Sequence, residues 1–207
     1  MPVKASVQAA PVAYTYNWTG WYLGAHVGYL SGTINTTVNP FNALPASTKT
    51  NSTFAGIQGG YRHQFSNNVV LGAQLGAPLI ATKDDTLIFG NLNEGKMVYS
   101  VLGQIQLGYA FGRVMPYVTG GFGLARIKGR ETTAGGVASP WVTNTHTLGT
   151  IGVGVNVAIT EHWTAGVVYN RVIASSERYD CGPTVCGIVG SFDMKANTIA
   201  GVLEYRF

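Results

Sequence analysis

Apolar side chains alternate with small or polar side chains in eight segments of this 207-residue chain, and this alternation limits the possible folds more than any other feature. A repeat of two residues is typical of a β-strand with two unlike faces, whereas an amphipathic helix repeats every 3.6 residues. In the first segment, every second residue from Trp21 to Tyr29 is apolar, and the residues between them are Tyr, Gly, His and Gly. The eight predicted strands are 20–29, 55–62, 69–77, 97–111, 117–125, 151–159, 163–169 and 199–207.

The distribution of charge between the two faces indicates which face is enclosed. The apolar face carries no Lys, Arg, Asp or Glu, and charged residues form only 11% of the chain, against about 25% in soluble proteins. A soluble β-sandwich or lipocalin would show charges on its outer face and an apolar interior. Because backbone groups in hydrocarbon must be paired internally, a sheet spans a membrane only when it closes on itself. The sequence therefore predicts an all-β protein, an eight-stranded antiparallel up-and-down transmembrane β-barrel, which is the smallest bacterial type.

Short and long links alternate between the predicted strands. The links at 65–68, 112–113 and 160–162 are tight, and we expect the long links at 31–51, 78–96, 128–144 and 172–194. Outer-membrane barrels have short periplasmic turns and long extracellular loops, which predicts periplasmic termini. Aromatic residues fall where two interfacial girdles are expected. They are Trp21, Tyr61, Tyr109, Phe111, Trp163, Tyr205 and Phe207 near the periplasmic ends, and Tyr29, Phe54, Tyr99 and Tyr169 near the other ends.

The opposite face of the strands predicts a polar lumen. Eight strands leave an interior just wide enough for side chains to fill it. We expect a polar cluster in which Glu204 pairs with Arg62 or Arg206, because an unpaired enclosed charge is costly. A narrow water path remains open as an alternative, and a wide pore does not. The predicted cluster consists of Gln58, Arg62, Gln74, Gln104, Gln106, Tyr117, Asn156, Glu204 and Arg206.

Three stretches resemble the small outer-membrane β-barrel proteins of alphaproteobacteria, a family of surface antigens and porin-like proteins related in architecture to OmpA and OmpX barrels. They are "YNWTGWYLGAHVGY", "QLGYAFGRVMPYVTGGFGLA" and "LEYRF", and the resemblance covers residues 17–207. It implies a bacterial outer-membrane location. Members are described as envelope-stabilising proteins, as adhesins and, in one branch, as hemin binders. The terminal strand, with Leu203, Tyr205 and Phe207, resembles the signal by which the outer-membrane assembly machinery recognises its substrates.

Two further segments, residues 1–16 and the last long link, carry fewer signals. Residues 1–16 are expected to be a short periplasmic lead, and because they lack the apolar core of a signal peptide, we expect that a signal peptide has been removed. Cys181 and Cys186 lie in "CGPTVC" within the last long link. We expect them to form a disulfide, which an oxidising envelope permits. Two thiolates without a further ligand fall short of a structural zinc site, so no metal is expected.

The sequence does not favour an enzyme. The four histidines have no Ser or acidic residue at a same-face spacing on a strand, and His162 follows Glu161 in a tight turn. No cofactor is expected. Hemin capture by the loops remains an alternative, with His146, Tyr179 and Met194 as candidate ligands.

The predicted function is a structural surface barrel that contributes to envelope integrity, with long loops for surface interaction. Its alternatives are a narrow porin-like channel for small solutes and a hemin-binding or adhesin barrel. The net charge of +4 is spread out, without the basic patch that nucleic-acid binding needs. Expected partners are outer-membrane lipids and lipopolysaccharide, the assembly machinery, and a host or surface ligand of the loops. Cations in or beside the long links are candidates for lipopolysaccharide phosphates: Lys49, Lys83, Lys96, Lys128, Arg130 and Arg178.

Overall fold

The computed structural model describes residues 16–39, 46–79, 83–88, 91–132, 142–174, 177–179 and 189–207. These residues form strands and short turns, and within them no helix is long and apolar enough to cross a membrane. The strands are β1 (Gly20–Asn39), β2 (Ala46–Gln64), β3 (Val69–Leu79), β4 (Lys83–Ile88), β5 (Asn91–Tyr109), β6 (Val114–Thr132), β7 (Val142–Ala158), β8 (Trp163–Ala174), β9 (Glu177–Tyr179) and β10 (Val189–Arg206).

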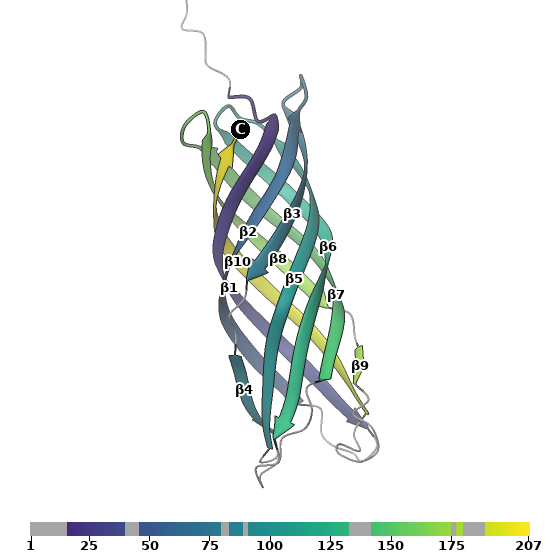
Figure 1. Cartoon of the computed structure of the whole chain (residues 1–207). Coiled ribbons are helices and arrows are strands. Elements are labelled where there is room, and N and C mark those ends of the chain that lie inside the picture. The colour runs from purple at the N-terminus through teal and green to yellow at the C-terminus, as the bar shows by residue number, and fades with distance from the viewer. Residues whose placement is uncertain are drawn as a thin grey trace, which may run out of the picture.

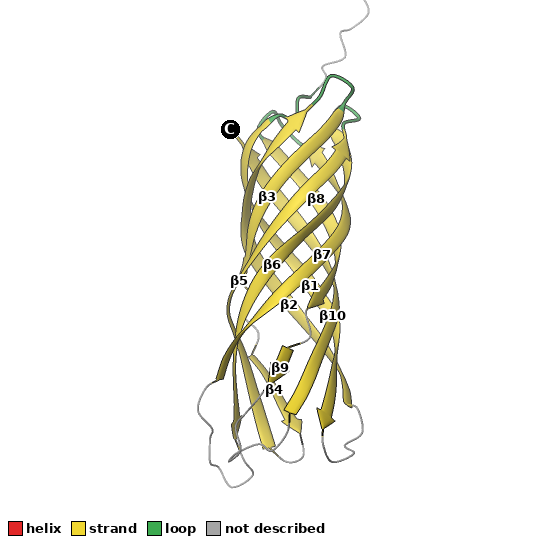
Figure 2. Ribbon diagram, turned by 90° about the vertical axis from the view of Figure 1, so that its right-hand side faces the viewer, coloured by secondary structure: helices red, strands yellow, loops and turns green. Residues whose placement is uncertain are grey.

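The strands form one closed antiparallel barrel, as Figures 1 and 2 show. The order around the barrel is β1-β2-β3-β5-β6-β7-β8-β10, and β1 pairs with β10 to close the sheet. The short β4 pairs with β5 beyond the end of β3, and β9 pairs with β10 beyond the end of β8. Each short strand thus continues the line of its predecessor. The prediction of an eight-stranded antiparallel barrel is confirmed.

Both ends of the described chain lie at the same end of the barrel, which we call the turn end (Figure 1). The three tight links are there, at 65–68, 110–113 and 159–162. Asn68 and Gly112 adopt left-handed backbone conformations in two of these links, with φ of 66° and 62°. Asn and Gly are the residues that tolerate this conformation, which lets the chain reverse within four residues. We call the opposite end the loop end.

The strands extend much further towards the loop end than the sequence analysis predicted. The long links expected at 31–51, 78–96, 128–144 and 172–194 were wrong in extent, because β1 continues to Asn39 and β2 already begins at Ala46. Similar extensions occur in β5, β6, β7 and β10. The apolar alternation stops near Tyr29, but backbone pairing continues through Thr-rich and Asn-rich sequence such as "TINTTVN". The strand positions that carry the apolar band hold only Thr or Asn from Thr33 to Asn39, so the apolar-outward pattern no longer marks the strand there.

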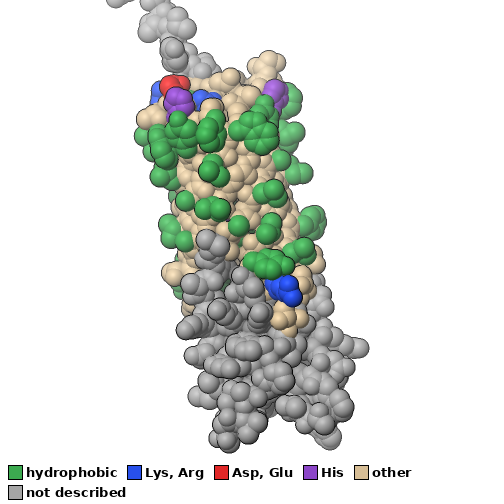
Figure 3. All heavy atoms as spheres, viewed as in Figure 1, with side chains coloured by type: hydrophobic (Ala, Val, Ile, Leu, Met, Phe, Trp, Pro, Cys, Tyr) green, Lys and Arg blue, Asp and Glu red, His purple; other side chains and the backbone are tan. Residues whose placement is uncertain are grey.

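The outer wall of the barrel carries an apolar band. Exposed side chains on it include Trp21, Val27, Ile105, Phe122 and Ile151, each more than 60% exposed. Figure 3 shows hydrophobic side chains spread over this wall, with charged and histidine side chains at its upper and lower margins. A monomer in water rarely exposes so large an apolar surface. The band is therefore built to contact hydrocarbon.

The spacing of two tyrosines gives the height of the band. Tyr99 and Tyr109 are ten residues apart on β5 and both are exposed. At about 3.3 Å per residue and a tilt of about 40°, this distance corresponds to a height of about 25 Å, which matches outer-membrane barrels. Most of the predicted girdle residues point outward. Phe54 was assigned to the girdle wrongly: it has inward parity on β2 and its ring contacts that of the inward His26, with centroids 5.8 Å apart.

The apolar band predicts how charge is tolerated on the outer wall. Replacing Ile105 with Arg should lower the free energy of unfolding in phospholipid vesicles by about 2 to 4 kcal/mol, because the new cation enters hydrocarbon near the midplane. The control is Thr145→Arg, on the outer wall of β7 at the loop end, which should change little. Urea titration followed by tryptophan fluorescence measures both. Equal tolerance of the two arginines would contradict the assignment of the band.

Candidate functional site: a filled lumen

An ion pair between β2 and β10 is buried in the lumen. The Arg62 Nη1 atom lies 2.7 Å from the Glu204 Oε2 atom, and the two side chains are only 4% and 2% exposed. β1 lies between the two strands, and its Gly24 pairs with Glu204 on one side and with Gln58 on the other. A Cβ atom at Gly24 would overlap the backbone and side chain of β10 at Glu204. Glycine at this position therefore makes room for the carboxylate.

The carboxylate of Glu204 accepts hydrogen bonds on both oxygens. Arg62 Nη2 and Gln58 Nε2 donate to Oε1 at 2.9 and 2.8 Å. Arg62 Nη1, Thr164 Oγ1 and Asn156 Nδ2 donate to Oε2 at 2.7, 3.1 and 3.3 Å. A buried ion pair is tolerated only when its geometry is good and its remaining polar atoms are bonded, and Glu204 meets both conditions.

The guanidinium of Arg62 is held on two further sides. Its Nε atom donates to Gln106 Oε1 at 3.0 Å, and its Cζ atom lies 3.9 Å from the centroid of the Tyr22 ring. A cation over an aromatic face is attracted by the negative face of the ring's quadrupole, and more strongly where water is excluded. The position of Arg62 is therefore fixed by Glu204, an amide and a ring together.

A chain of amides continues the network around the lumen. Gln106 Nε2 and the Tyr22 hydroxyl both donate to Gln74 Oε1, at 2.7 and 2.9 Å. Gln74 Nε2 donates to Gln104 Oε1 at 2.9 Å, and Gln104 Nε2 donates to Thr150 Oγ1 at 3.3 Å. Residues from seven strands thus meet through side-chain hydrogen bonds. We call this set, centred on Glu204, the lumen network.

The structure brings together seven of the nine residues predicted for the lumen cluster. Gln58, Arg62, Gln74, Gln104, Gln106, Asn156 and Glu204 all belong to the lumen network. The other two lie elsewhere: Tyr117 packs in an apolar cluster, and Arg206 donates to the carbonyl oxygens of Glu161 and Thr19 at the turn end. Sequence reasoning missed Tyr22, Thr150 and Thr164, although their inward parity on β1, β7 and β8 was a usable signal.

A second, apolar layer fills the lumen at the turn end. Trp18 lies just before β1 and is 2% exposed, with its backbone N–H donating to Gln64 Oε1 at 2.8 Å and its indole N–H donating to the Gly112 carbonyl at 3.0 Å. Both donors of this side chain and backbone are therefore satisfied inside the barrel. We call the cluster the turn-end plug; its buried members are Tyr16, Trp18, Val70, Ala110, Met115, Tyr117 and Ala158.

Tyr16 packs against Trp18 within the turn-end plug. Its ring lies 4.9 Å from that of Trp18 in an edge arrangement, and the Arg206 guanidinium lies 4.5 Å from its centroid. Burial raises the pKa of the Tyr16 phenol, although nearby Arg206 acts in the opposite direction, so the ring is neutral at physiological pH. The alternation of strands carried no signal for Tyr16 or Trp18, because both precede the first strand. The only available signal was two aromatics in "YNW" directly before β1.

The family of the chain follows from its sequence as well as from this barrel. The sequence profile described as "Outer membrane protein beta-barrel domain" matches residues 3–207, nearly the whole chain. The chain belongs to the outer-membrane β-barrel family. Its location is therefore the bacterial outer membrane, and the predicted membership among the small outer-membrane barrels is confirmed.

Two relatives of known name from Brucella agree with this membership. The chain is 30% identical over 170 residues to the "31 kDa outer-membrane immunogenic protein" of Brucella melitensis. The alignment covers 75% of this chain and 70% of the relative, and the protein of the same name from Brucella suis matches equally. Among solved structures, Ail, the attachment invasion locus protein of Yersinia pestis, aligns with a TM-score of 0.48 at 13% identity, covering 91% of this chain and 99% of Ail.

The remaining predicted sites divide into described and undescribed positions. Leu203, Tyr205 and Phe207 lie on the outer wall of β10 and at its end, with Phe207 73% exposed, and their role in assembly stays a prediction. His146 is buried on β7 with inward parity, so its expected place on an outer loop was wrong. Cys181 and Cys186 lie outside the described residues, as do the side chains of Tyr179 and Met194. Within the described residues, no group of three metal-ligating side chains occurs.

The two ion pairs of the described structure offer a matched test of the lumen network. Replacing Glu204 with Gln leaves Arg62 charged and buried, so the free energy of unfolding in vesicles should fall by about 3 to 5 kcal/mol. Replacing Arg113 with Gln removes an exposed bridge to Glu161, whose side chains are 46% and 54% exposed, and should cost less than about 1 kcal/mol.

A double variant completes the cycle. Glu204→Gln combined with Arg62→Met removes both charges. The double variant should lose less free energy of unfolding than the sum of the losses in the single variants Glu204→Gln and Arg62→Met. If Glu204→Gln were as mild as Arg113→Gln, the ion pair would not be the centre of the lumen packing.

Proposed function

We propose that this protein is a structural component of the outer membrane, that its barrel is closed to solutes, and that it contributes to envelope integrity without catalysis. The observation that carries the proposal is the lumen network, in which one buried carboxylate on β10 receives donors from β2, β7 and β8. An arrangement of this kind fixes strands relative to one another. It is suited to rigidity rather than to turnover or transport.

Two layers in series support the idea of a closed lumen. The turn-end plug fills one end with aromatic and aliphatic side chains, and the lumen network fills the middle with bonded polar groups. Inward glycines do not open a path for solutes where side chains of neighbouring strands occupy the space beside the glycine. At Gly154, for example, a Cβ atom would overlap the Tyr117 ring.

The orientation proposed for the barrel places the turn end in the periplasm. Three tight links lie at the turn end, and short turns in outer-membrane barrels are periplasmic. β1 continues for ten residues beyond Tyr29, the last aromatic of its outer wall. At about 3.3 Å per residue and a tilt of about 40°, the strand extends roughly 25 Å beyond the apolar band. This extension supports a loop end raised above the cell surface, where host or surface ligands would meet it.

The rival classes have less support in the described residues. The Glu161 carboxylate beside His162 accepts a hydrogen bond from Arg113 at 3.0 Å, and the His162 imidazole stacks on the Tyr205 ring with centroids 5.6 Å apart. His146, one of the candidate hemin ligands, has inward parity on β7. A lipid-modification assay and the Soret absorbance of added hemin test these two alternatives.

Conductance in planar bilayers tests the closed lumen. Wild-type protein should give at most small, flickering currents, because side chains fill an eight-stranded interior. Trp18→Ala should increase the frequency of brief openings, since it removes the centre of the turn-end plug but leaves the lumen network. Trp21→Ala is the matched control, because Trp21 is three residues away and 66% exposed on the outer wall. Large, steady steps from wild-type protein would favour the porin-like alternative.

A gene deletion separates the structural role from transport. Cells without the protein should become more sensitive to detergents and chelators, with unchanged uptake of small solutes, and the wild-type gene should restore resistance. Slower solute uptake with normal detergent resistance would contradict the proposed role.

A further inference from the structure

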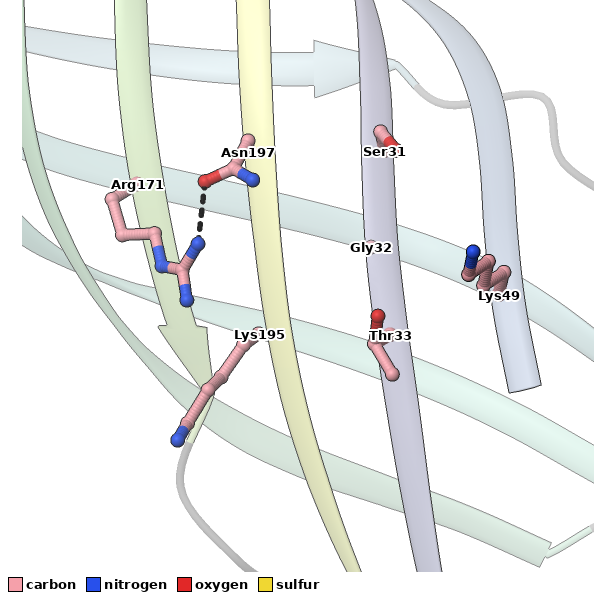
Figure 4. A pocket seen from close by; sticks show the side chains of 7 residues that line it. All are labelled: Ser31, Gly32, Thr33, Lys49, Arg171, Lys195 and Asn197. Carbon is pink, nitrogen blue, oxygen red and sulfur yellow. Dashed lines mark hydrogen bonds between the residues drawn. The ribbon is translucent and has the colours of Figure 1, made fainter. Parts of the chain in front are cut away.

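A groove on the outer wall gathers three cations at the loop end of the apolar band. It has a volume of about 330 Å³, at the lower end of the range for small-molecule sites, and it crosses β1, β2, β8 and β10. Figure 4 shows that its side chains come from neighbouring strands across the closure of the barrel. We call it the basic groove; its lining side chains are Ser31, Thr33, Lys49, Arg171, Lys195 and Asn197.

The strand register orders the basic groove into two rows. Arg171 pairs with Asn197, which pairs with Ser31. One step further from the apolar band, Thr33 pairs with Lys195 on one side and with Lys49 on the other. Cross-strand neighbours on one face lie about 5 Å apart, so each row is a continuous polar surface.

The basic groove begins where the apolar band ends. The next row towards the turn end from Arg171, Asn197 and Ser31 consists of Tyr169, Ile199 and Tyr29, which are all exposed on the outer wall. Tyrosines at this depth are typical of the boundary between hydrocarbon and headgroups. The groove therefore faces the headgroup layer of the leaflet that surrounds the loop end. The apolar rows on its turn-end side face the acyl chains of that leaflet.

The cations of the basic groove carry no counter-charge among the described side chains. The ion pairs among the described side chains are Arg62 with Glu204 and Arg113 with Glu161, and neither pair lies in the groove. Arg171 donates through Nη1 to Asn197 Oδ1 at 2.7 Å, and this neutral amide orients the guanidinium without cancelling its charge. The hydroxyls of Ser31 and Thr33 add hydrogen-bonding groups between the cations.

From this arrangement we infer that the basic groove binds the phosphate groups of a phosphorylated glycolipid of the outer leaflet, the lipid A part of lipopolysaccharide. A guanidinium matches a phosphate with two parallel hydrogen bonds, and each lysine adds a compact charge. The inference rests on the proposed orientation, which places the loop end in the outer leaflet. Of the cations predicted from sequence for this role, Lys49 belongs to the groove, and Arg171 and Lys195 are additions that only the closed register brings beside it.

Binding of purified lipid A to protein refolded in zwitterionic micelles tests the inference, with the bound lipid counted by native mass spectrometry. An interfacial cation attracts an anionic lipid with about 1 kcal/mol, or about fivefold in affinity. The double variant Arg171→Gln/Lys195→Gln should therefore bind about 25-fold more weakly than wild type. The control double variant Arg113→Gln/Arg126→Gln also removes two cations, from the turn end and from the outer wall of β6, and should change affinity less than threefold.

Further arms identify the ligand and check the fold. Arg171→Lys should keep most of the affinity, dephosphorylated lipid A should bind like the double variant, and millimolar inorganic phosphate should not displace the lipid. The heat-modifiable gel shift should stay unchanged, because the replaced side chains are exposed. Equal binding by wild type and the groove variant, or displacement by inorganic phosphate, would overturn the inference. These measurements use neither conductance nor detergent resistance, so they fail independently of the proposed structural role.

Discussion

The pairing of β1 with β10 is the constraint on which the rest of this structure depends. In hydrocarbon no water is present to bond free backbone groups, so an open sheet edge is excluded and the first strand must meet the last. The register runs from Tyr22 opposite Arg206 to Asn39 opposite Val189 without interruption. Closure fixes the parity of every strand, because a shift of one residue would turn the apolar wall inward. It also creates both the lumen network and the basic groove, each of which uses residues from the two ends of the chain.

Closure with eight strands makes the lumen narrow, and this explains its chemistry. The interior holds side chains and little else, so a carboxylate placed there must be neutralised and bonded by its neighbours. Glu204 meets Arg62 across β1 only because Gly24 leaves the space between them. The turn-end plug closes the lumen at one end, where Tyr16 and Trp18, which precede β1, pack against inward side chains of β3, β6 and β7. Rigidity from the first and closure from the second suit a structural barrel of the outer membrane.

Much of this architecture was predictable from sequence because lipid imposes a two-residue pattern. Parity alone assigned Ile105 to the wall and Gln104 to the lumen, and it narrowed the partner of Glu204 to two arginines. It failed where lipid does not act. The Thr-rich extension of β1 carries Thr or Asn at the positions that are apolar in the band, so strand was mistaken for loop. Trp18 lies outside the alternation. The nearness of Arg171 to Lys49 depends on the pairing of β1 with β10 across the closure, which joins residues more than 100 positions apart in the chain.

Backbone NMR of the refolded protein in lipid bilayers or nanodiscs tests closure most directly. We expect inter-strand contacts that join residues 22–29 of β1 to residues 199–206 of β10 in the register of Leu23 opposite Tyr205 and Ala25 opposite Leu203. We also expect amide protection in these two strands as strong as in β5 and β6 at the same depth. Absence of these contacts, together with rapid exchange of β1 and β10 amides as in the edge strands of an open sheet, would contradict a closed eight-stranded barrel.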